Sequence, residues 1–538
     1  MKLVSASDSF KGSLSSARIG ELLETAAHEV LPDAECAVCP IADGGEGTLD
    51  AVSRVFEGAR ISFPAHDGLM RPMQGEILVH DGRALVEAAS TCGLALLDAT
   101  ERNPLLTTSY GVGECIRFAL DRKCSEIHVA LGGSCTNDGG MGCLRALGIR
   151  FLDVEGCELS GRGADLAKVA RIDASGLHPW VKHATVTILG DVDNPLLGAC
   201  GATWVFGRQK GADDAALETL ESGMHHFAEV ISDAYPTVDF DTAGYGAAGG
   251  LGMALAVFLN ARIRSGVEEL LSLIGFDSII EDADLVVTGE GRLDGQSLHG
   301  KAISGVVAHA KRAGVPVAAI CGTVALEGQD LSRLGLYRAV DASKGQTLEY
   351  ALAHAEQNYL NAARSLLSSL QMLVRKATES DFGRIMEIYA IARDFMAQHG
   401  NPYQWGPTSW PPETLIHQDI ARGKSYVCLS AGRIVGVFFF DFGKDVEPTY
   451  AHIEDGSWID ESSYGVVHRV ASDGSMKGVG SFCIDWAFAQ CGHLRIDTHG
   501  DNTVMQRLLE KLGFAHRGTV FVEEDDYPRL AFEKTSKG

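Results

Sequence analysis

The chain has 538 residues and carries 46 Lys and Arg against 71 Asp and Glu, for a formal net charge of −25 at pH 7. At about 150 residues per domain, this length predicts three or four domains rather than one compact core. The hydrophobic content of 46% and the charged content of 22% are typical of a globular protein and exclude wholesale disorder. The acidic balance argues against nucleic acid or anionic lipid as a partner, because both need a basic surface. A small anionic substrate would need local positive charge to overcome the repulsive field.

The sequence shows no targeting or membrane signal. The segment MKLVSASDSFKG has too short an apolar run for a signal peptide, and no later stretch reaches the roughly 18 apolar residues of a membrane span. The 13 cysteines lack the regular spacing of a disulfide framework, which favours reduced thiols. We therefore expect a cytoplasmic protein without a membrane partner. Its oligomeric state has no signature in the sequence.

Residues 1 to about 370 alternate short β-branched runs with amphipathic stretches, joined by glycine-dense loops. The run KLVSAS at 2–7 is followed by apolar residues at helical spacing between Ile19 and Val30. The same unit recurs around EIHVALGG, TVTILGD, ADLVVTGEG and VPVAAICG. This alternation predicts an α/β fold with parallel, helix-covered sheets. Ligands of such sheets collect beyond the carboxyl ends of the strands, where the glycine loops fall.

The sequence pattern changes near residue 371, where we place the main domain boundary. The segment LVRKATESDF at 373–382 predicts an edge strand followed by a helix start, with Thr378 as the N-cap. The runs YVCLS and IVGVFFFDF flank residues 431–433 and predict a β-hairpin. Strands now follow one another directly, and aromatic residues are denser than before.

Five loops of the first part combine glycine with side chains suited to phosphate, Mg²⁺ or hydroxyl groups. Lys11 lies in a loop that leads into a helix N-terminus, and free N–H groups, the helix dipole and the lysine together favour an anion. The loops are DSFKGS at 8–13, IADGGEGT at 41–48, GGSCTNDGG at 132–140, GYGAAGGLG at 244–252 and GEGRLDGQSLHGK at 289–301. No one of them is decisive alone, because glycine loops also cap helices for purely structural reasons.

The last of these loops resembles a phosphate-binding P-loop only in part. Gly295, Gly300 and Lys301 have the P-loop spacing, but Ala302 stands where Ser or Thr would hold Mg²⁺. The pattern is also separated from the preceding strand by residues 289–294. We predict that this is not a P-loop, although Lys301 is placed to reach a phosphate.

Taken together and in order, the loop sequences resemble a known family. The strings DSFKGS, PIADGGEGT, EAASTCGL, NPLLTTSYGVGE, GGSCTNDGGMG, DVDNPLLG, VFGRQKGA, GAAGGLG and TGEGRLDGQSLHGK are similar to those of bacterial glycerate kinases with two α/β domains. The resemblance implies phosphorylation of D-glycerate by ATP with Mg²⁺, usually to 2-phosphoglycerate. It also implies a Rossmann-like lobe from residues 1–60 and 285–370, an inserted second α/β lobe from 61–284, and a substrate cleft between them.

Phosphoryl transfer needs an alcohol placed in line with the γ-phosphate, and cations or N–H groups to neutralise the transferred group. We assign Lys11 and Arg292 to substrate or phosphate charge and Asp191 to the general base, with Asp294 as its competitor. Asp193 is the candidate Mg²⁺ ligand. The further substrate-binding or phosphate-binding candidates are Asp8, Ser9, Asp43, Gly44, Gly45, Asn137, Asp138, Glu290 and Lys301.

Residues 372–538 carry a second resemblance. The strand VVHRVAS, the glycine turn and helix SMKGVGSFCIDWAFAQ, the strand HLRIDTH and the helix DNTVMQRLLEKLGF resemble, in this order, the GNAT acyltransferases. That resemblance implies an α+β fold, acetyl-CoA as cofactor and an amine acceptor that the sequence does not identify. It places Val470 in the strand beside the pantetheine arm and Asn502 beside the thiol. The implied pyrophosphate-binding residues are Lys477, Gly478, Val479, Gly480 and Ser481.

Two departures from the GNAT pattern leave alternatives open. Ser475 replaces the Arg or Gln that begins the pyrophosphate turn, and Leu509 replaces the Tyr often used as general acid. Substitute acids would come from His499, Tyr527, Glu523 or Cys491. In one alternative, the C-terminal unit is a non-catalytic acyl-CoA sensor that regulates the kinase. In another, the first part binds sugar acids without phosphorylating them.

Overall fold

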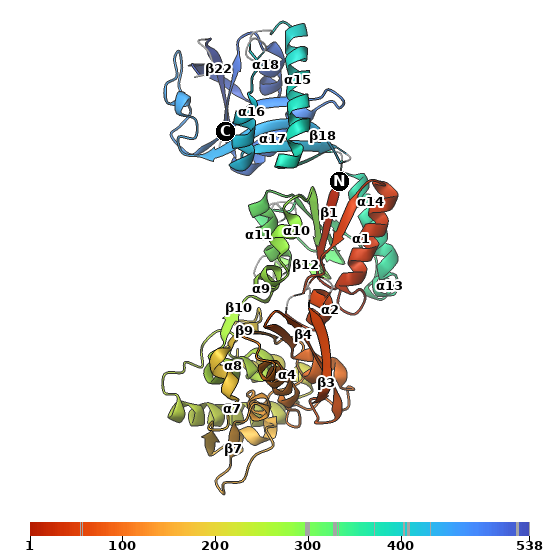
Figure 1. Cartoon of the computed structure of the whole chain (residues 1–538), viewed down its shortest axis with the longest axis vertical. Helices are drawn as coiled ribbons and strands as arrows, with labels where there is room; N and C mark the ends of the chain where they lie inside the picture. Colours follow the sequence, from red (N-terminus) through yellow and green to blue (C-terminus); the bar gives the residue numbers. More distant parts are fainter. Residues whose placement is uncertain are drawn as a thin grey trace.

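The computed structural model describes residues 1–42, 44–53, 55, 58–295, 302–326, 331, 333–370, 372–401, 404–405, 409–430, 432–522 and 527–536. Its three large sheets follow one another along the long axis of the molecule (Figure 1). A five-stranded sheet lies in the middle, between a six-stranded sheet at one end and the C-terminal seven-stranded sheet at the other. The expected α/β class of the first part and α+β class of the last part are confirmed.

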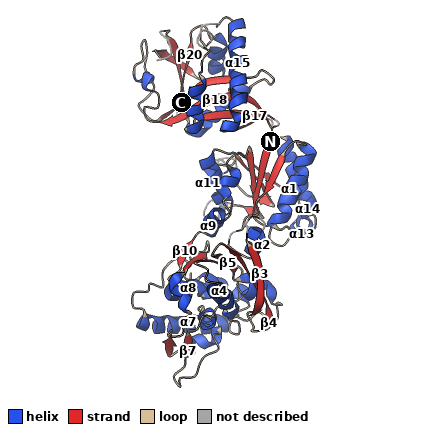
Figure 2. Ribbon diagram, in the orientation of Figure 1, coloured by secondary structure: helices blue, strands red, loops and turns tan. Residues whose placement is uncertain are grey.

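The middle sheet is parallel throughout and has helices on both faces (Figure 2). Its strand order is β15-β13-β11-β1-β2. The core on one face includes α1 and α14, and the core on the other includes α9, α10 and α11. The strands are β1 (Lys2–Ser7), β2 (Glu35–Val38), β11 (Leu285–Gly289), β13 (Val317–Cys321) and β15 (Arg338–Asp341). The helices are α1 (Ser16–Val30), α2 (Thr48–Ser53), α9 (Gly266–Leu273), α10 (Phe276–Ile280), α11 (Ala302–Ala313), α13 (Leu348–Ala353) and α14 (Ala355–Ser368).

The six-stranded sheet is mixed, in contrast to the all-parallel sheet expected from the sequence. Its order is β10-β9-β6-β5-β4-β3, and the pairs β3–β4 and β4–β5 are antiparallel. The turn between β4 and β5 contains Asp81 and Gly82, whose φ angles of 44° and 76° suit a tight two-residue hairpin. The strands are β3 (Ala59–His66), β4 (Pro72–His80), β5 (Arg83–Glu87), β6 (Glu126–Ala130), β9 (Thr185–Leu189) and β10 (Arg262–Arg264). The helices include α4 (Tyr110–Asp121), α5 (Met141–Ala146), α7 (Asp214–Ala234) and α8 (Leu251–Leu259).

The segment between these two sheets bears on where one lobe ends and the other begins. Helices α9 and α10 contact α11, which covers the middle sheet, although the core that they share also contains Ala130 and Leu189 of the six-stranded sheet. Between the end of β9 and residue 285, only β10 pairs with the six-stranded sheet. We therefore propose that the second stretch of the Rossmann-like lobe begins near residue 265, before the expected residue 285.

The C-terminal sheet has the order β16-β17-β18-β19-β20-β22-β21, with only β19–β20 parallel. That pair is in register at Gly465↔Leu494 and Val466↔Arg495 alone, so the two strands separate beyond residue 466. The strands are β16 (Leu373–Lys376), β17 (Ser425–Ser430), β18 (Arg433–Gly443), β19 (Tyr464–Ser472), β20 (His493–His499), β21 (Ala515–Val520) and β22 (Arg529–Thr535). The helices are α15 (Phe382–Gln398), α16 (Glu413–Ala421), α17 (Val479–Cys491) and α18 (Thr503–Lys511).

Two local predictions of secondary structure are confirmed, the helix cap at Thr378 and the hairpin after residue 424. Thr378 and Asp381 form a reciprocal capping box just before α15. The strands β17 and β18 form the expected antiparallel hairpin. None of the described helices is long and apolar enough to cross a membrane. All 13 cysteines are free thiols.

A buried ion network joins the C-terminal unit to the middle sheet. Arg375 in β16 donates from Nε to Asp284 Oδ1 at 2.5 Å and from Nη1 and Nη2 to the carboxylate of Asp381 at 2.6 and 2.9 Å. All three side chains are at most 9% exposed. Burial alone would lower the pKa of Arg375, but the bonds and charges of Asp381 and Asp284 outweigh it and raise that pKa. Asp284 directly precedes β11, so the network ties the two units at the base of that strand.

Removing this arginine should destabilise the protein far more than removing a surface arginine. Arg375→Met leaves Asp284 and Asp381 buried without their cation, which costs about 3–5 kcal/mol. The control Arg364→Met breaks an exposed pair with Glu29 and should leave the unfolding midpoint nearly unchanged. Urea unfolding followed by tryptophan fluorescence measures both. Equal midpoint shifts for the two variants would contradict the structural role of the network.

Candidate functional site

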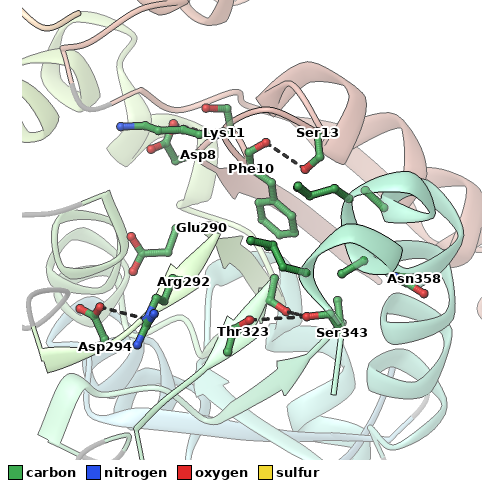
Figure 3. A pocket seen from close by; sticks show the side chains of 18 of the residues that line it. Asp8, Phe10, Lys11, Ser13, Glu290, Arg292, Asp294, Thr323, Ser343 and Asn358 are labelled. Carbon is green, nitrogen blue, oxygen red and sulfur yellow. Dashed lines mark hydrogen bonds and ion pairs between the residues drawn. The ribbon is translucent and has the colours of Figure 1, made fainter. Parts of the chain in front are cut away.

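Four loops meet at one edge of the middle sheet. They follow β1, β11, β13 and β15, and parallel strands place their carboxyl ends at the same edge. A cavity of about 490 Å³ lies there, lined by residues from all four loops and from α13 and α14 (Figure 3). The candidates predicted from the sequence that lie on its wall are Asp8, Ser9, Lys11, Glu290, Arg292 and Asp294.

The backbones of β1, β11 and β13 fix this edge closely. The Asp8 N–H donates to the Gly289 carbonyl at 2.9 Å, and the Ser9 N–H donates to Asp8 Oδ1 at 2.7 Å. A Cβ on Gly289 would lie 2.0 Å from the carbonyl oxygen of Ile320, so only glycine fits at this strand end. The loop after β1 is therefore held directly against the loop after β11.

The cavity has a charged end and an apolar wall. Figure 3 shows Asp8, Lys11, Glu290, Arg292 and Asp294 together on one side, with Asn358 on the opposite side beyond Phe10. Arg292 Nε lies 3.4 Å from Asp294 Oδ2, and the arginine side chain is 70% exposed. The apolar wall consists of Phe10, Leu348, Ala351, Leu352 and Ala355. A ligand with one anionic end and one flat apolar end matches this arrangement.

The cavity also contains polar residues that the sequence analysis did not single out. Ser343 Oγ donates to the Gly322 carbonyl, and Thr323 Oγ1 lies 3.5 Å from Ser343 Oγ. Asp341 accepts from the Ser343 N–H at 3.0 Å and holds this loop. Both loops directly follow strands, so the rule that ligands collect at strand ends could have identified them.

A second group of loops connects the two sheets. The loop after β2 contacts the carboxyl ends of β6 and β9: the Gly132 N–H donates to the Gly44 carbonyl at 3.0 Å, and a Cβ on Gly44 would lie 3.2 Å from the Leu189 carbonyl oxygen. Glu87 of β5 accepts from the N–H groups of Gly47 and Leu49 at 3.0 and 2.8 Å. Burial raises the pKa of Glu87, partly offset by these bonds.

The remaining acidic candidates of the second lobe do not line the cavity. Asp191 follows β9 and accepts from the Gly266 N–H at 3.0 Å, at the start of α9. Asp193 is exposed in the same loop. Gly44 and Gly45 belong to the connecting loop rather than to the cavity wall. Asp43 and Lys301 lie outside the described residues.

Asn137 and Asp138 are fully buried, which favours a structural role over contact with a ligand. Asp138 accepts from Ser109 and from the N–H groups of Gly140 and Gly142 at 2.7–3.2 Å, and so caps α5. The Asn137 amide donates to Thr203 Oγ1 at 3.1 Å. Beside them, Lys210 donates to the Thr136 carbonyl at 2.7 Å, and burial lowers its pKa to about 8.

The glycine turn of the C-terminal unit opens a helix, as the sequence predicts. Gly478 is the N-cap of α17 with φ of 88°, and Gly480 lies in the first turn. A cavity of about 300 Å³ beside this turn is lined by Val470, Gly480, Asn502 and apolar residues of α15 and α18. Lys477, Val479 and Ser481 do not line it. Asn502 caps α18 by accepting from the Met505 N–H at 3.1 Å.

None of the described substitute acids is well placed. Leu509, which replaces the usual tyrosine, is fully buried. Cys491 donates to the Ala487 and His493 carbonyls, and burial raises its pKa. His499 and Tyr527 pack against each other and do not line the cavity beside the glycine turn. Glu523 lies outside the described residues.

Comparisons with known structures cover both parts of the chain. A crystal structure from Salmonella typhimurium LT2, assigned as glycerate kinase 2, is 37% identical, with a TM-score of 0.60, covering 69% of this chain and 98% of that one. A GNAT family acetyltransferase from Streptococcus agalactiae 2603 is 29% identical, with a TM-score of 0.27, covering 31% of this chain and 96% of that one.

A curated relative and a family model both match the first part. The "Glycerate 2-kinase" of Escherichia coli K12 is 39% identical over 385 residues, which cover 70% of this chain and all of the relative. The model of the glycerate kinase family matches residues 3–371, well over half of the chain. The chain therefore belongs to the glycerate kinase family.

Proposed function

We propose that residues 1–370 phosphorylate D-glycerate with ATP and form 2-phosphoglycerate. The observation that carries this proposal is the cavity at the carboxyl edge of the middle sheet, where cations and carboxylates meet an apolar wall. The Escherichia coli relative, named a glycerate 2-kinase, supports the position phosphorylated. A sugar-acid binder without kinase activity would have no use for the apolar wall of this cavity.

ATP fits the cavity in one orientation. The base packs on Phe10, Leu348 and Leu352, and the phosphates face Lys11 and Arg292. These groups provide the local positive charge that an anionic ligand needs in a chain of net charge −25.

The described residues suit a Mg²⁺ ion that arrives with the nucleotide. No group of three or more His, Cys, Asp or Glu in the described part of the chain could hold a metal by itself. A nucleotide-bound Mg²⁺ needs only one or two protein carboxylates, with phosphates and water as its other ligands. Asp8 and Glu290 on the charged side fit that need better than Asp193, which lies off the cavity. The ion would neutralise charge on the transferred phosphoryl group.

The geometry of in-line transfer favours one of the two candidates for the base. The attacking and leaving oxygens lie on opposite sides of the phosphorus. With the adenine on the apolar wall, glycerate approaches from the side of the second lobe, where the loop of Asp191 follows β9. We therefore keep Asp191 as the proposed base, and we assign Asp294 to orienting Arg292 beside the phosphates.

Two variants separate these roles. Asp191→Asn removes the proton acceptor and should lower kcat by about 100-fold or more, while the KM for ATP stays near the wild-type value. Asp294→Asn loosens Arg292 and should mainly raise the KM for ATP. Steady-state kinetics with ATP and D-glycerate measures both. If Asp191→Asn keeps a near-normal kcat while Asp294→Asn loses it, the assignments are reversed.

We further propose that the C-terminal unit is a GNAT-type domain that binds acetyl-CoA and acetylates an amine. Two observations support this: β19 and β20 separate beyond residue 466, and α17 begins at a glycine beside that gap. The separated part of β19 can hydrogen-bond a pantetheine arm, and the first turn of α17 can bind the pyrophosphate. The rival is a non-catalytic acyl-CoA sensor, motivated by the buried Leu509 in place of an acid.

Filling the gap should abolish acetyl-CoA binding. A Cβ on Gly480 would lie 3.3 Å from Leu508 and 3.9 Å from Val470, so Gly480→Val narrows the space between β19 and α18. In a thermal-shift assay, acetyl-CoA at 100 times its Kd stabilises the wild type by about 2.7 kcal/mol. We expect no shift for Gly480→Val.

The matched control is Gly383→Val. Gly383 is also the second residue of its helix, and a Cβ there meets no atom within 4 Å. Its acetyl-CoA shift should equal that of the wild type. A normal shift for Gly480→Val would place the cofactor elsewhere. Acetyl-CoA that changes glycerate turnover without any amine being acetylated would establish the sensor instead.

A further inference from the structure

The C-terminal unit has a second cavity that joins the first where β19 and β20 separate. Its volume is about 480 Å³. The two cavities share the lining residues Met396, Trp405, Val470, Asn502 and Met505. The smaller is mainly apolar, and the larger is lined by several acidic and basic side chains. A group bound in one cavity can therefore contact a group bound in the other.

Two ion pairs line the larger cavity, and within each pair the opposite charges neutralise one another. Arg469 donates to Asp419 Oδ2 at 2.6 Å, and Lys424 donates to Asp441 Oδ2. Burial raises the pKa of Asp419, offset in part by Arg469. These four side chains are therefore paired with one another inside the protein.

His468 is the exception, because it lies between two carboxylates. Its Nε2 is 3.1 Å from Glu447 Oε2, and its Nδ1 is 3.5 Å from Asp497 Oδ1. Thr449 donates to Glu447 from Oγ1 at 2.6 Å, and the Tyr450 hydroxyl donates to Asp497 Oδ1 at 2.7 Å. The imidazole is 18% exposed and lines the cavity. The shorter contact favours the tautomer that carries its proton on Nε2, toward Glu447, and leaves Nδ1 as the nitrogen on the side of Asp497.

A β-bulge brings this histidine to the cavity. The pairing of β18 with β19 shifts between Val437 and Phe439, whose partners are Ala471 and His468. Arg469, inside the bulge, has φ of 55°. Adjacent strand residues normally point to opposite faces, but His468 and Arg469 line the same cavity.

Two carboxylates, Glu447 and Asp497, contact His468 directly, and the basic side chains of the same cavity are Arg422, Lys424, Arg469 and Arg529. Burial would raise the pKa of Glu447, but the bond and charge of His468, together with Thr449, outweigh it and lower that pKa to about 2. Burial raises the pKa of Tyr450, which therefore stays a neutral donor. The titratable groups facing His468 are Glu447 and Tyr450 from 447–451, Asp497 from β20 and Asp419 from α16.

Resting on the acetyltransferase function proposed above, we propose that this larger cavity is the acceptor site for a primary alkylammonium group and that His468 removes its proton. Asp497 binds the ammonium, and His468 Nδ1 takes one proton from it. Glu447 stabilises the imidazolium that forms and is a positioning residue. The site thus combines attraction of a cation with a group that converts it into a nucleophile.

The transfer step balances without a further reactant. The freed amine lone pair attacks the thioester carbonyl of acetyl-CoA, the N–C bond forms and the C–S bond breaks. Of the three ammonium protons, one passes to His468 and then to water, one passes to the departing thiolate, and one remains on the amide. A general base placed in this way contributes about 10²–10⁴-fold to the rate.

The test uses the full chain with acetyl-CoA and a panel of primary amines comprising amino acids, 1,4-diaminobutane and an amino sugar. Amine-dependent CoA release is measured by chromatography between pH 6 and 10. His468→Gln should lower kcat/KM about 100-fold or more near neutral pH. The deficit should shrink as the pH approaches about 10, where an alkylammonium loses its proton unaided. The control His452→Gln changes an 82% exposed histidine of the same unit and should match the wild type.

A thermal shift with acetyl-CoA, unchanged in His468→Gln, shows that this variant is folded and binds cofactor. Unaltered kcat/KM in His468→Gln would overturn the proposal, as would a deficit that is the same at every pH. Absence of amine-dependent CoA release from the wild type, despite an acetyl-CoA shift, would also overturn it. Absence of the shift in the wild type would instead remove the underlying acetyl-CoA function.

Discussion

The parallel pairing of β1 with β11 is the constraint on which the kinase site depends. Register Ser7↔Gly289 joins residues that are far apart in the sequence, with the entire second lobe between them. Gly289 lies so close to Ile320 that the ends of β1, β11 and β13 are fixed at one edge. Closing so long a loop costs little more than closing one of half the length, because the entropy grows only with the logarithm of length. The cavity is therefore lined by loops from the beginning and from the end of residues 1–370, while the inserted lobe folds around its own core.

The C-terminal site is formed in the opposite way, by strands that separate rather than by strands that are held together. There, two neighbouring parallel strands part after Val466, and the gap between them is lined by two connected cavities. The first unit places its charged residues at strand ends, whereas His468 and Asp497 of the C-terminal unit lie within β19 and β20. Arg375 connects them, because it bonds Asp284 at the start of β11 and Asp381 at the start of α15. The two proposed sites lie at different edges and share this buried link.

Local pattern predicted most elements, but it did not predict their tertiary surroundings. β1, α1 and β20 follow directly from apolar spacing, and Thr378 from capping chemistry. The alternation of strands and helices does not predict the antiparallel β4–β5 pair, although Asp81-Gly82 between them is a strong hairpin signal. Asp138 looked like an exposed loop carboxylate, yet it is buried as a helix cap, and burial depends on contacts distant in sequence. The position of His468 depends on a bulge in β19, and the residue types in this strand do not predict that bulge.

The central claim is that the nucleotide lies at the carboxyl edge of the middle sheet. The direct measurement is photolabelling with 8-azido-ATP and Mg²⁺, followed by mass spectrometry of the labelled peptides, with and without excess ATP. We expect ATP-protected label in the segment that carries Leu348 and Leu352, beside the adenine. Protected label confined to the second lobe, around residues 132–140 or 190–194, would contradict it.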